Sequence, residues 1–335
     1  SAETQITIND LVNSATDYPW FDSILFESSD VKWFGSATGL VKLDGSAEFI
    51  NISNSMLGRG YVTKLFIDNN YRKWFYAWGS IPLSVPVLPP GYLSSLANNN
   101  WSTYNATNSP VDIGGVAAVS DFYSTDMFFA LYSVMGNTEL YKYSSGVWTH
   151  MTVPQTQYDE ILYMWYDYVT GWLWVDFAGA NGENNLFITY DGNNWIPVPN
   201  YPVYDINKMK RLNNLIWIAS PQGLIKYNGS VFTLYNTSNS GLPGNYISSV
   251  DFDSEGNIWA GTSKGLVKFD GTNWIVYDRN NSPLSCDNIS GMAIDSLDNI
   301  FIGTQTILYP YPTVPSVGLV KFDGNNWTFF TSDNS

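Results

Sequence analysis

The sequence has very little of the chemistry that hydrolytic enzymes and nucleic-acid-binding proteins commonly use. Its 335 residues include a single histidine, His150, and a single cysteine, Cys286. An internal disulfide and a histidine–cysteine metal cluster are therefore excluded, and a nucleophilic triad is disfavoured. Lysine and arginine number 15 against 30 acidic residues, and the formal net charge of −15 repels nucleic acid and anionic membrane surfaces. We expect no nucleic-acid partner and no cofactor.

Long apolar runs are also missing. No stretch approaches the roughly 20 apolar residues of a membrane-spanning helix, so we expect no direct membrane insertion. The first residues, SAETQITIND, have neither a basic region nor an apolar core, and no signal peptide is expected in this numbering. Aromatic residues make up 16% of the chain and charged residues only 13%. This acidic, aromatic-rich composition favours a β-rich extracytoplasmic protein, whether periplasmic, secreted or virion-associated.

An internal repeat organises what is present. An aromatic residue followed by a short apolar run recurs at Trp33, Trp74, Phe128, Trp174, Trp217, Trp259 and Phe301. A second aromatic series follows in step, at Phe49, Trp101, Trp148, Trp195, Phe232, Trp274 and Trp327. The successive spacings of the first series are 41, 54, 46, 43, 42 and 42 residues. A period of this length indicates a repeated supersecondary unit.

Residues 246–288 show the unit most clearly. They contain an alternating strand, YISSVDFD, then the turn DSEGN, the strand NIWAGT, the link SK, the strand GLVKFD, the turn GTN and the strand WIVYD. Four antiparallel strands, repeated seven times, predict one all-β domain over 1–335: a seven-bladed β-propeller of four-stranded antiparallel blades. The blades are placed at 20–60, 61–115, 116–157, 158–202, 203–245, 246–288 and 289–335. We expect the N-terminal segment 1–19, through ITINDLV, to pair with the last blade.

The motifs of this unit resemble the two-component regulator propeller repeat. That family has Gly-Asn-(Leu/Ile)-Trp-(Ile/Ala)-Gly-Thr, then Gly-Leu, then an Asp-Gly turn before an aromatic residue. GNIWAGTSKGLVKFDGTNW (256–274) matches throughout, and DNIFIGT…GLVKFDGNNW (298–327) matches closely, whereas blades two to four are placed mainly by spacing. The resemblance implies a seven-bladed propeller of the type found in the sensing regions of membrane-bound regulators. A sensor role is a hypothesis that follows from it.

Most of the conspicuous residues are explained by the scaffold. Ten of the fourteen tryptophans occupy the two series, and we interpret them as packing between neighbouring blades. The Asp-Gly pairs at Asp44, Asp191, Asp270 and Asp323 are typical of tight hairpin turns. The tryptophans outside both series, which remain available for recognition, are Trp20, Trp78, Trp165 and Trp172.

Three segments interrupt the repeat. They are 76–91, 176–185 and 304–317, and each enlarges the link between the second and third strands of a blade. These links share one face with the connections between blades, whereas the hairpins of the other face are tight throughout. Segments that break a repeat on one face are the expected place for binding.

The candidate binding residues belong to that face. We expect an aromatic-lined cleft beside blade one, formed by Trp78, Tyr92, Tyr309 and Tyr311. Blade-entry residues predicted to point toward the central pore are Trp20, Asp22, Arg59, Asp159, Asp205, Asn245 and Asp287. Aromatic platforms with Asp, Asn and Arg suit a neutral or weakly basic sugar, or a peptide loop. Alternatively, the insertions cover apolar rim surface or contact a partner subunit.

Two chemical alternatives depend on carboxylates. A glycosidase needs a pair about 5–9.5 Å apart, which Asp22, Asp159, Glu160, Asp205 and Asp287 are the residues available to supply. A second pattern, Asp251, Asp253 and Glu255 in DFDSEG, resembles the start of a calcium loop but coincides with an ordinary turn of the repeat. We therefore expect no metal site.

The sequence favours a non-catalytic binding or interaction module that recognises a carbohydrate or protein surface through the insertion-bearing face. Two alternatives stay open. One is a structural or attachment component of an extracellular or viral assembly, with an assembly partner. The other is a carbohydrate-active enzyme, a glycosidase or lyase, on a propeller scaffold.

Overall fold

The computed structural model describes most of the repeat units. The residues described are 21–27, 31–36, 39–44, 47–50, 61–67, 71–78, 92–104, 108–110, 116–119, 126–132, 138–153, 161–178, 185–202, 205–304 and 319–330. These residues form strands and turns, and none of the described segments is a helix that could cross a membrane. They fall into two compact units, one ending at Pro199 and one from Asn200 onward.

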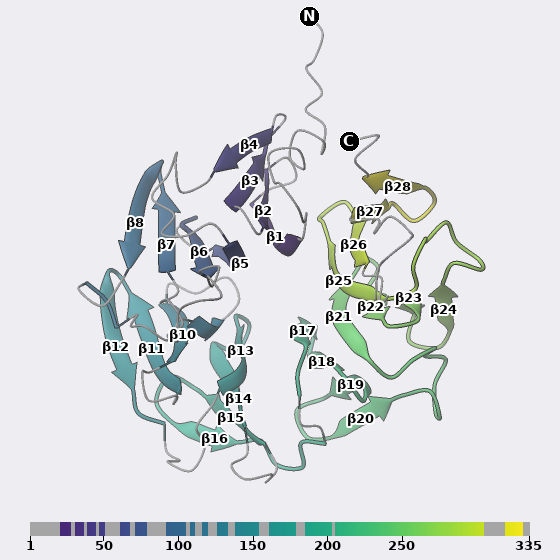
Figure 1. Cartoon of the computed structure of the whole chain (residues 1–335). Helices are drawn as coiled ribbons and strands as arrows, with labels where there is room; N and C mark the ends of the chain where they lie inside the picture. The colour runs from purple at the N-terminus through teal and green to yellow at the C-terminus, as the bar shows by residue number, and fades with distance from the viewer. Residues whose placement is uncertain are drawn as a thin grey trace, which may run out of the picture. The chain divides into compact units, whose positions relative to one another are not determined.

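The first unit contains four four-stranded antiparallel sheets (Figure 1). Within each sheet the strands are neighbours in chain order, and we call them a to d. The strands are β1 (Phe21–Phe26), β2 (Lys32–Ser36), β3 (Gly39–Leu43), β4 (Ala47–Ile50), β5 (Tyr61–Ile67), β6 (Lys73–Trp78), β7 (Tyr92–Ala97), β8 (Asn100–Tyr104), β9 (Val116–Val119), β10 (Asp126–Tyr132), β11 (Thr138–Ser144), β12 (Val147–Met151), β13 (Ile161–Asp167), β14 (Trp172–Phe177), β15 (Leu186–Tyr190) and β16 (Trp195–Pro197).

The second unit contains three sheets of the same design. Its strands are β17 (Lys208–Leu212), β18 (Leu215–Ser220), β19 (Gly223–Tyr227), β20 (Phe232–Tyr235), β21 (Ile247–Phe252), β22 (Ile258–Thr262), β23 (Gly265–Phe269), β24 (Trp274–Tyr277), β25 (Ile289–Ile294), β26 (Ile300–Thr304), β27 (Leu319–Phe322) and β28 (Trp327–Phe330). Seven four-stranded antiparallel sheets over the described residues confirm the predicted all-β, seven-bladed fold class.

The burial pattern along a sheet explains the sequence pattern. Strand β22 is buried at every position because it lies inside its sheet and packs against neighbouring sheets on both faces, which is why it reads as an unbroken small and apolar run. Strand β24, the last of the same sheet, is only partly covered. The chain therefore alternates between inner strands selected for packing and outer strands that tolerate polar residues.

Tryptophans of the first aromatic series pack between consecutive sheets, as predicted. In the second unit, Trp259 stacks on Tyr277 of its own sheet at 5.9 Å and meets the edge of Phe322 in the next sheet at 6.1 Å. In the first unit, Trp33 and Phe75 join the first two sheets, with ring centroids 5.7 Å apart. Each such contact buries two large apolar rings.

The densest aromatic cluster joins the second and third sheets. Trp74 lies 5.1 Å from both Tyr104 and Tyr143, and the guanidinium of Arg72 lies over the Trp74 ring and donates to the Tyr143 hydroxyl at 2.9 Å. Burial raises the pKa of Tyr104 to about 12, and its hydroxyl lies 3.3 Å from that of Tyr143. Arg72, in the a–b hairpin as predicted, therefore supports packing.

The structure also places three residues that do not belong to the two aromatic series. The expectation that Trp165 is available for recognition is wrong: its side chain is 4% exposed and its ring lies 6.3 Å from that of Trp174. Trp172, at the start of β14, is half-buried. The single histidine, His150, is exposed in the outer strand β12 and lies edge-on to Tyr141 at 5.1 Å, as expected for a surface histidine. The segment ITINDLV and Trp20 lie outside the described residues.

Candidate functional site

The b–c link is two residues long in the first, fifth and sixth sheets and five residues long in the third. In the fifth sheet the Ser220 hydroxyl donates to the Gly223 carbonyl at 2.8 Å and accepts the Gln222 N–H at 3.2 Å. In the sixth sheet the Thr262 hydroxyl makes the same two contacts, with Gly265 at 2.8 Å and Lys264 at 2.9 Å. A hydroxyl at the end of strand b therefore closes the link.

The b–c links of the second, fourth and seventh sheets are much longer. Strand pairing continues to the base of each one, through Ala77↔Tyr92, Phe177↔Leu186 and Gly303↔Leu319. Between these pairs the chain adds 14, 8 and 15 residues, counted as 78–91, 178–185 and 304–318. Most of these inserted residues lie outside the described part of the chain. Each insertion thus begins and ends on paired strands of a regular sheet.

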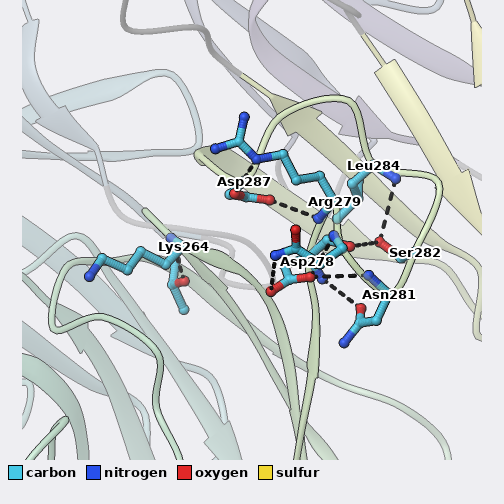
Figure 2. A network of polar contacts seen from close by, with 9 residues as sticks. Lys264, Asp278, Arg279, Asn281, Ser282, Leu284 and Asp287 are labelled. Carbon is cyan, nitrogen blue, oxygen red and sulfur yellow. Dashed lines mark hydrogen bonds and ion pairs between the residues drawn. The ribbon is translucent and has the colours of Figure 1, made fainter.

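The d–a connections leave each sheet at the same end as the b–c links, because successive antiparallel strands alternate direction. Figure 2 shows the connection from the sixth to the seventh sheet. Asp287 accepts the Arg279 N–H at 2.8 Å and pairs with its guanidinium at 3.1 Å, and its carbonyl accepts the Gly265 N–H at 2.7 Å. Asp287 therefore fastens the connection to the b–c link beside it.

The preceding connection repeats the arrangement. Asn245 accepts the Thr237 N–H at 3.0 Å, as Asp287 accepts that of Arg279. Asn239 and Asn281 each donate to a carbonyl of the d strand at 2.9 Å. Leu242 and Leu284, which occupy the same position in the two connections, are both buried. These contacts make both connections well-defined surfaces next to short b–c links.

The predicted site residues are distributed as follows. Asn245 and Asp287 lie in the connections just described, and Asp205 is exposed before β17. Asp22, Trp78 and Tyr92 belong to β1, β6 and β7, and their side chains lie outside the described part of the structure. The candidates that fall wholly outside the described residues are Trp20, Arg59, Asp159, Tyr309 and Tyr311. Sequence reasoning missed Asn207, whose side chain donates to the Ile247 carbonyl at 2.6 Å and joins two sheets.

Carboxylates at the other end of the sheets are held by turn hydrogen bonds. Backbone N–H groups of Asn194 and Asn193 lower the pKa of Asp191, and those of Asn326 and Asn325 do the same for Asp323. Asp270 behaves likewise through Asn273. These groups are ionised turn-formers, the role predicted for the Asp-Gly pairs.

The three acidic residues of the calcium-like pattern belong to two hydrogen-bond networks, because Asp253 and Glu255 both accept from the Asn257 amide whereas Asp251 has other donors. Asp251 accepts from the Lys210 ammonium at 3.0 Å and the Ile294 N–H at 3.2 Å. Asp253 accepts from the Trp259 indole at 2.9 Å and from the Asn257 N–H at 2.8 Å. Among the described residues no group of three or more His, Cys, Asp or Glu side chains is arranged to hold a metal ion.

Comparison with known proteins agrees with this geometry. The family model of the two component regulator propeller matches residues 241–264, which cover the end of the connection from the fifth to the sixth sheet, strands β21 and β22, and the b–c link of the sixth sheet. The chain is a β-propeller, and this part of it is similar to the two component regulator propeller. A comparison of its sequence with curated proteins finds no match.

Solved structures share the propeller fold at low sequence identity. The extracellular domain of the putative hybrid two component system BT4673 from B. thetaiotaomicron aligns with a TM-score of 0.60 and 18% identity over 87% of this propeller and 37% of that chain. The corresponding domain of BT3049 aligns at 0.52 and 18% over 93% and 41%. A catalytically inactive virginiamycin B lyase from Staphylococcus aureus, solved with quinupristin, aligns at 0.58 and 12% over 84% and 90%. The propeller thus spans about two fifths of the two Bacteroides chains.

Proposed function

We propose that this propeller is a non-catalytic, extracytoplasmic recognition module. It binds a carbohydrate or protein surface through the insertions at its b–c links. The single observation that carries the proposal is the contrast between links. The links of the fifth and sixth sheets have two residues closed by a hydroxyl, whereas those of the second, fourth and seventh sheets have 8 to 15 residues between paired strand ends. Long segments presented from a rigid base are the usual carriers of binding.

The acid–base groups that the structure describes support binding rather than turnover. Asp191, Asp270 and Asp323 are committed to turns, and Asp253 to an indole and an amide. The virginiamycin B lyase that shares the fold is described as inactive after a histidine-to-alanine substitution. The only histidine here, His150, is exposed in an outer strand beside Tyr141.

The seventh sheet offers a clean test. Replacing residues 305–317 by Ser-Lys turns the strand-b-to-c sequence into GTSKGLVKFDG, identical to residues 261–271 of the sixth sheet. The short link should close as it does there, through the hydroxyl of Thr304. A matched control exchanges Pro221–Gln222 of the fifth sheet for Ser-Lys and leaves every insertion intact.

Wild type, exchange variant and control are applied to a glycan array and to an array of surface proteins from the native source. We expect signals on one array that the exchange removes and the control preserves. Blank arrays at high protein concentration, or signals equal in all three proteins, would contradict the proposal. Release of reducing ends from a polysaccharide, abolished by Asp205→Asn or Asp287→Asn, would overturn its non-catalytic part.

A further inference from the structure

A cleft of about 640 Å³ lies between the first and second sheets of the first unit. Its rim includes Glu27 and Tyr71, from the a–b turns of the two sheets, and Asn98 and Asn99, from the c–d turn of the second. The cleft is therefore at the end of these sheets away from the b–c insertion. Its volume falls in the range of roughly 300–1,000 Å³ that is typical of small-ligand sites.

The floor of the cleft is fixed by a bridging carboxylate. Glu27 accepts the Trp33 indole N–H at 2.8 Å through one oxygen and pairs with the Lys73 ammonium at 2.5 Å through the other. Trp33 is 2% exposed, and the ammonium of Lys42 lies 5.9 Å from its ring centroid. Because Trp33 and Lys73 belong to adjacent sheets, this network holds the two walls at a set separation.

Tyr71 is unusual for its position. It lies three residues before the aromatic residue of strand b, where other described sheets have Gly171, Gly256 and Asp298, all with φ between 61° and 82°. Tyr71 adopts the same left-handed conformation, with φ 56°, although a bulky side chain is disfavoured there by about 1–2 kcal/mol. Its side chain is 69% exposed. Strain of this kind, without burial to compensate for it, is characteristic of functional positions.

The remaining lining is chemically mixed. Trp101 is half-buried against Phe75 at 5.3 Å and contributes a second ring to the cleft. Glu48, Asn98 and Asn99 are exposed and provide carboxylate and amide groups. Two glutamates and two lysines line the cleft, so its formal charges cancel. A charge-neutral site does not favour phosphate, sulfate or a strongly charged peptide.

We propose that this cleft binds a neutral saccharide, with Tyr71 and Trp101 as the apolar platform and Glu48, Asn98 and Asn99 as partners for hydroxyl groups. A pyranose ring has apolar C–H faces that pack on aromatic rings and hydroxyls that both donate and accept hydrogen bonds. The lining supplies both kinds of contact. The site uses none of the b–c insertions, and the proposal does not rest on the function assigned to them.

The test is calorimetric titration of the whole chain with maltotriose, cellotriose, mannotriose and chitotriose. Tyr71→Asn is the decisive variant because asparagine tolerates φ > 0, so the ring is removed without adding backbone strain. We expect at least one trisaccharide to bind the wild type and to bind Tyr71→Asn at least about tenfold more weakly, a loss of about 1.4 kcal/mol. Glu48→Gln should weaken the same trisaccharide. Tyr168→Asn, which removes an exposed tyrosine from the a–b turn of the fourth sheet, is the control and should bind as the wild type does.

Several results would overturn the proposal. They are the absence of binding by every trisaccharide, equal affinity in Tyr71→Asn, and tighter binding of a sulfated trisaccharide than of its neutral parent. The variant with 305–317 exchanged for Ser-Lys keeps the cleft and should retain trisaccharide affinity. If this variant loses its array signals but keeps its trisaccharide affinity, the insertions and the cleft are separate binding sites. If it loses trisaccharide binding, the placement of the site in the cleft is contradicted.

Discussion

Trp259 and Trp217 occupy the same position in consecutive sheets of the second unit and differ mainly in one hydrogen bond. Each is 3% exposed. Trp259 stacks on Tyr277 at 5.9 Å and 18°, and its indole N–H donates to Asp253 at 2.9 Å. Trp217 stacks on Tyr235 at 6.0 Å and 18°, but its indole N–H is buried with no hydrogen-bond partner among the described residues. The pair therefore isolates the contribution of the indole–carboxylate bond.

Replacing either residue by phenylalanine removes the same volume from closely similar packing, so the cavity contributions largely cancel. Trp259→Phe additionally removes a hydrogen bond to a charged acceptor, which contributes about 1.5–3 kcal/mol. It also weakens the cation–π contact of Lys268, at 5.3 Å from the ring, by at most about 1 kcal/mol. Trp217→Phe instead removes an unpaired buried donor. We expect Trp259→Phe to lower the free energy of unfolding by at least about 2 kcal/mol more than Trp217→Phe.

The difference should depend on pH. Burial opposes ionisation of Asp253, but hydrogen bonds from Trp259 and Asn257 outweigh it and lower the pKa of the carboxyl group. A lowered pKa in the folded state adds stability above the unfolded value of about 3.9, and that stability is lost as the pH falls through the folded value. Urea unfolding at pH 7 and below pH 3 measures this. Equal destabilisation by the two substitutions at pH 7, or a difference that persists in acid, would refute the reasoning.

Two further outcomes follow from the scaffold. Gly265→Ala should lower the stability of the second unit to urea more than Gly271→Ala does. Both glycines have positive φ, but a Cβ at Gly265 would lie 2.6 Å from the Tyr277 carbonyl oxygen, whereas a Cβ at Gly271 would meet no atom within 4 Å. Ultraviolet titration should show the Tyr104 phenol ionising only near pH 12. The free energy of unfolding should fall above pH 10, because there the phenol of Tyr104 loses its proton in the unfolded chain but keeps it in the folded one. Ionisation of Tyr104 near pH 10 would contradict the burial of its side chain.

The repeat could be predicted from the sequence because it depends on local patterns. An apolar run with an aromatic residue defines strand b, and a Gly- or Asp-containing turn defines each hairpin, so spacing alone places the units. The sequence similarity of two d–a connections could also have been used to predict their shared structure. NTSNSGLPGN (236–245) and DRNNSPLSCD (278–287) align without a gap, with the same Asn, Ser and Leu at 239 and 281, 240 and 282, and 242 and 284, and Asn245 aligns with Asp287, whose contact it shares.

Other features could not be predicted because they depend on which residues the fold brings together from different strands and sheets. Strand β13 contains ILYMWYD, with large residues on both faces, so its pattern does not show that Trp165 is buried. The cleft is formed by turns of the first and second sheets, which are well separated in sequence, and Tyr71 is conspicuous only when its φ is compared with those of Gly171 and Gly256. Binding was expected on the face with the insertions, whereas Tyr71 and Trp101 line a cleft at the a–b and c–d turns of the opposite face.

The central claim is that the repeats form a self-sufficient scaffold and that the interruptions carry recognition. The direct measurement is a chain in which 79–90, 178–185 and 305–317 are all exchanged for Ser-Lys, studied by thermal unfolding and on both arrays. The account predicts cooperative unfolding close to that of the wild type and loss of every signal except trisaccharide binding in the cleft of Tyr71. Unfolding of the exchanged chain at room temperature, or retention of all array signals, would contradict the claim.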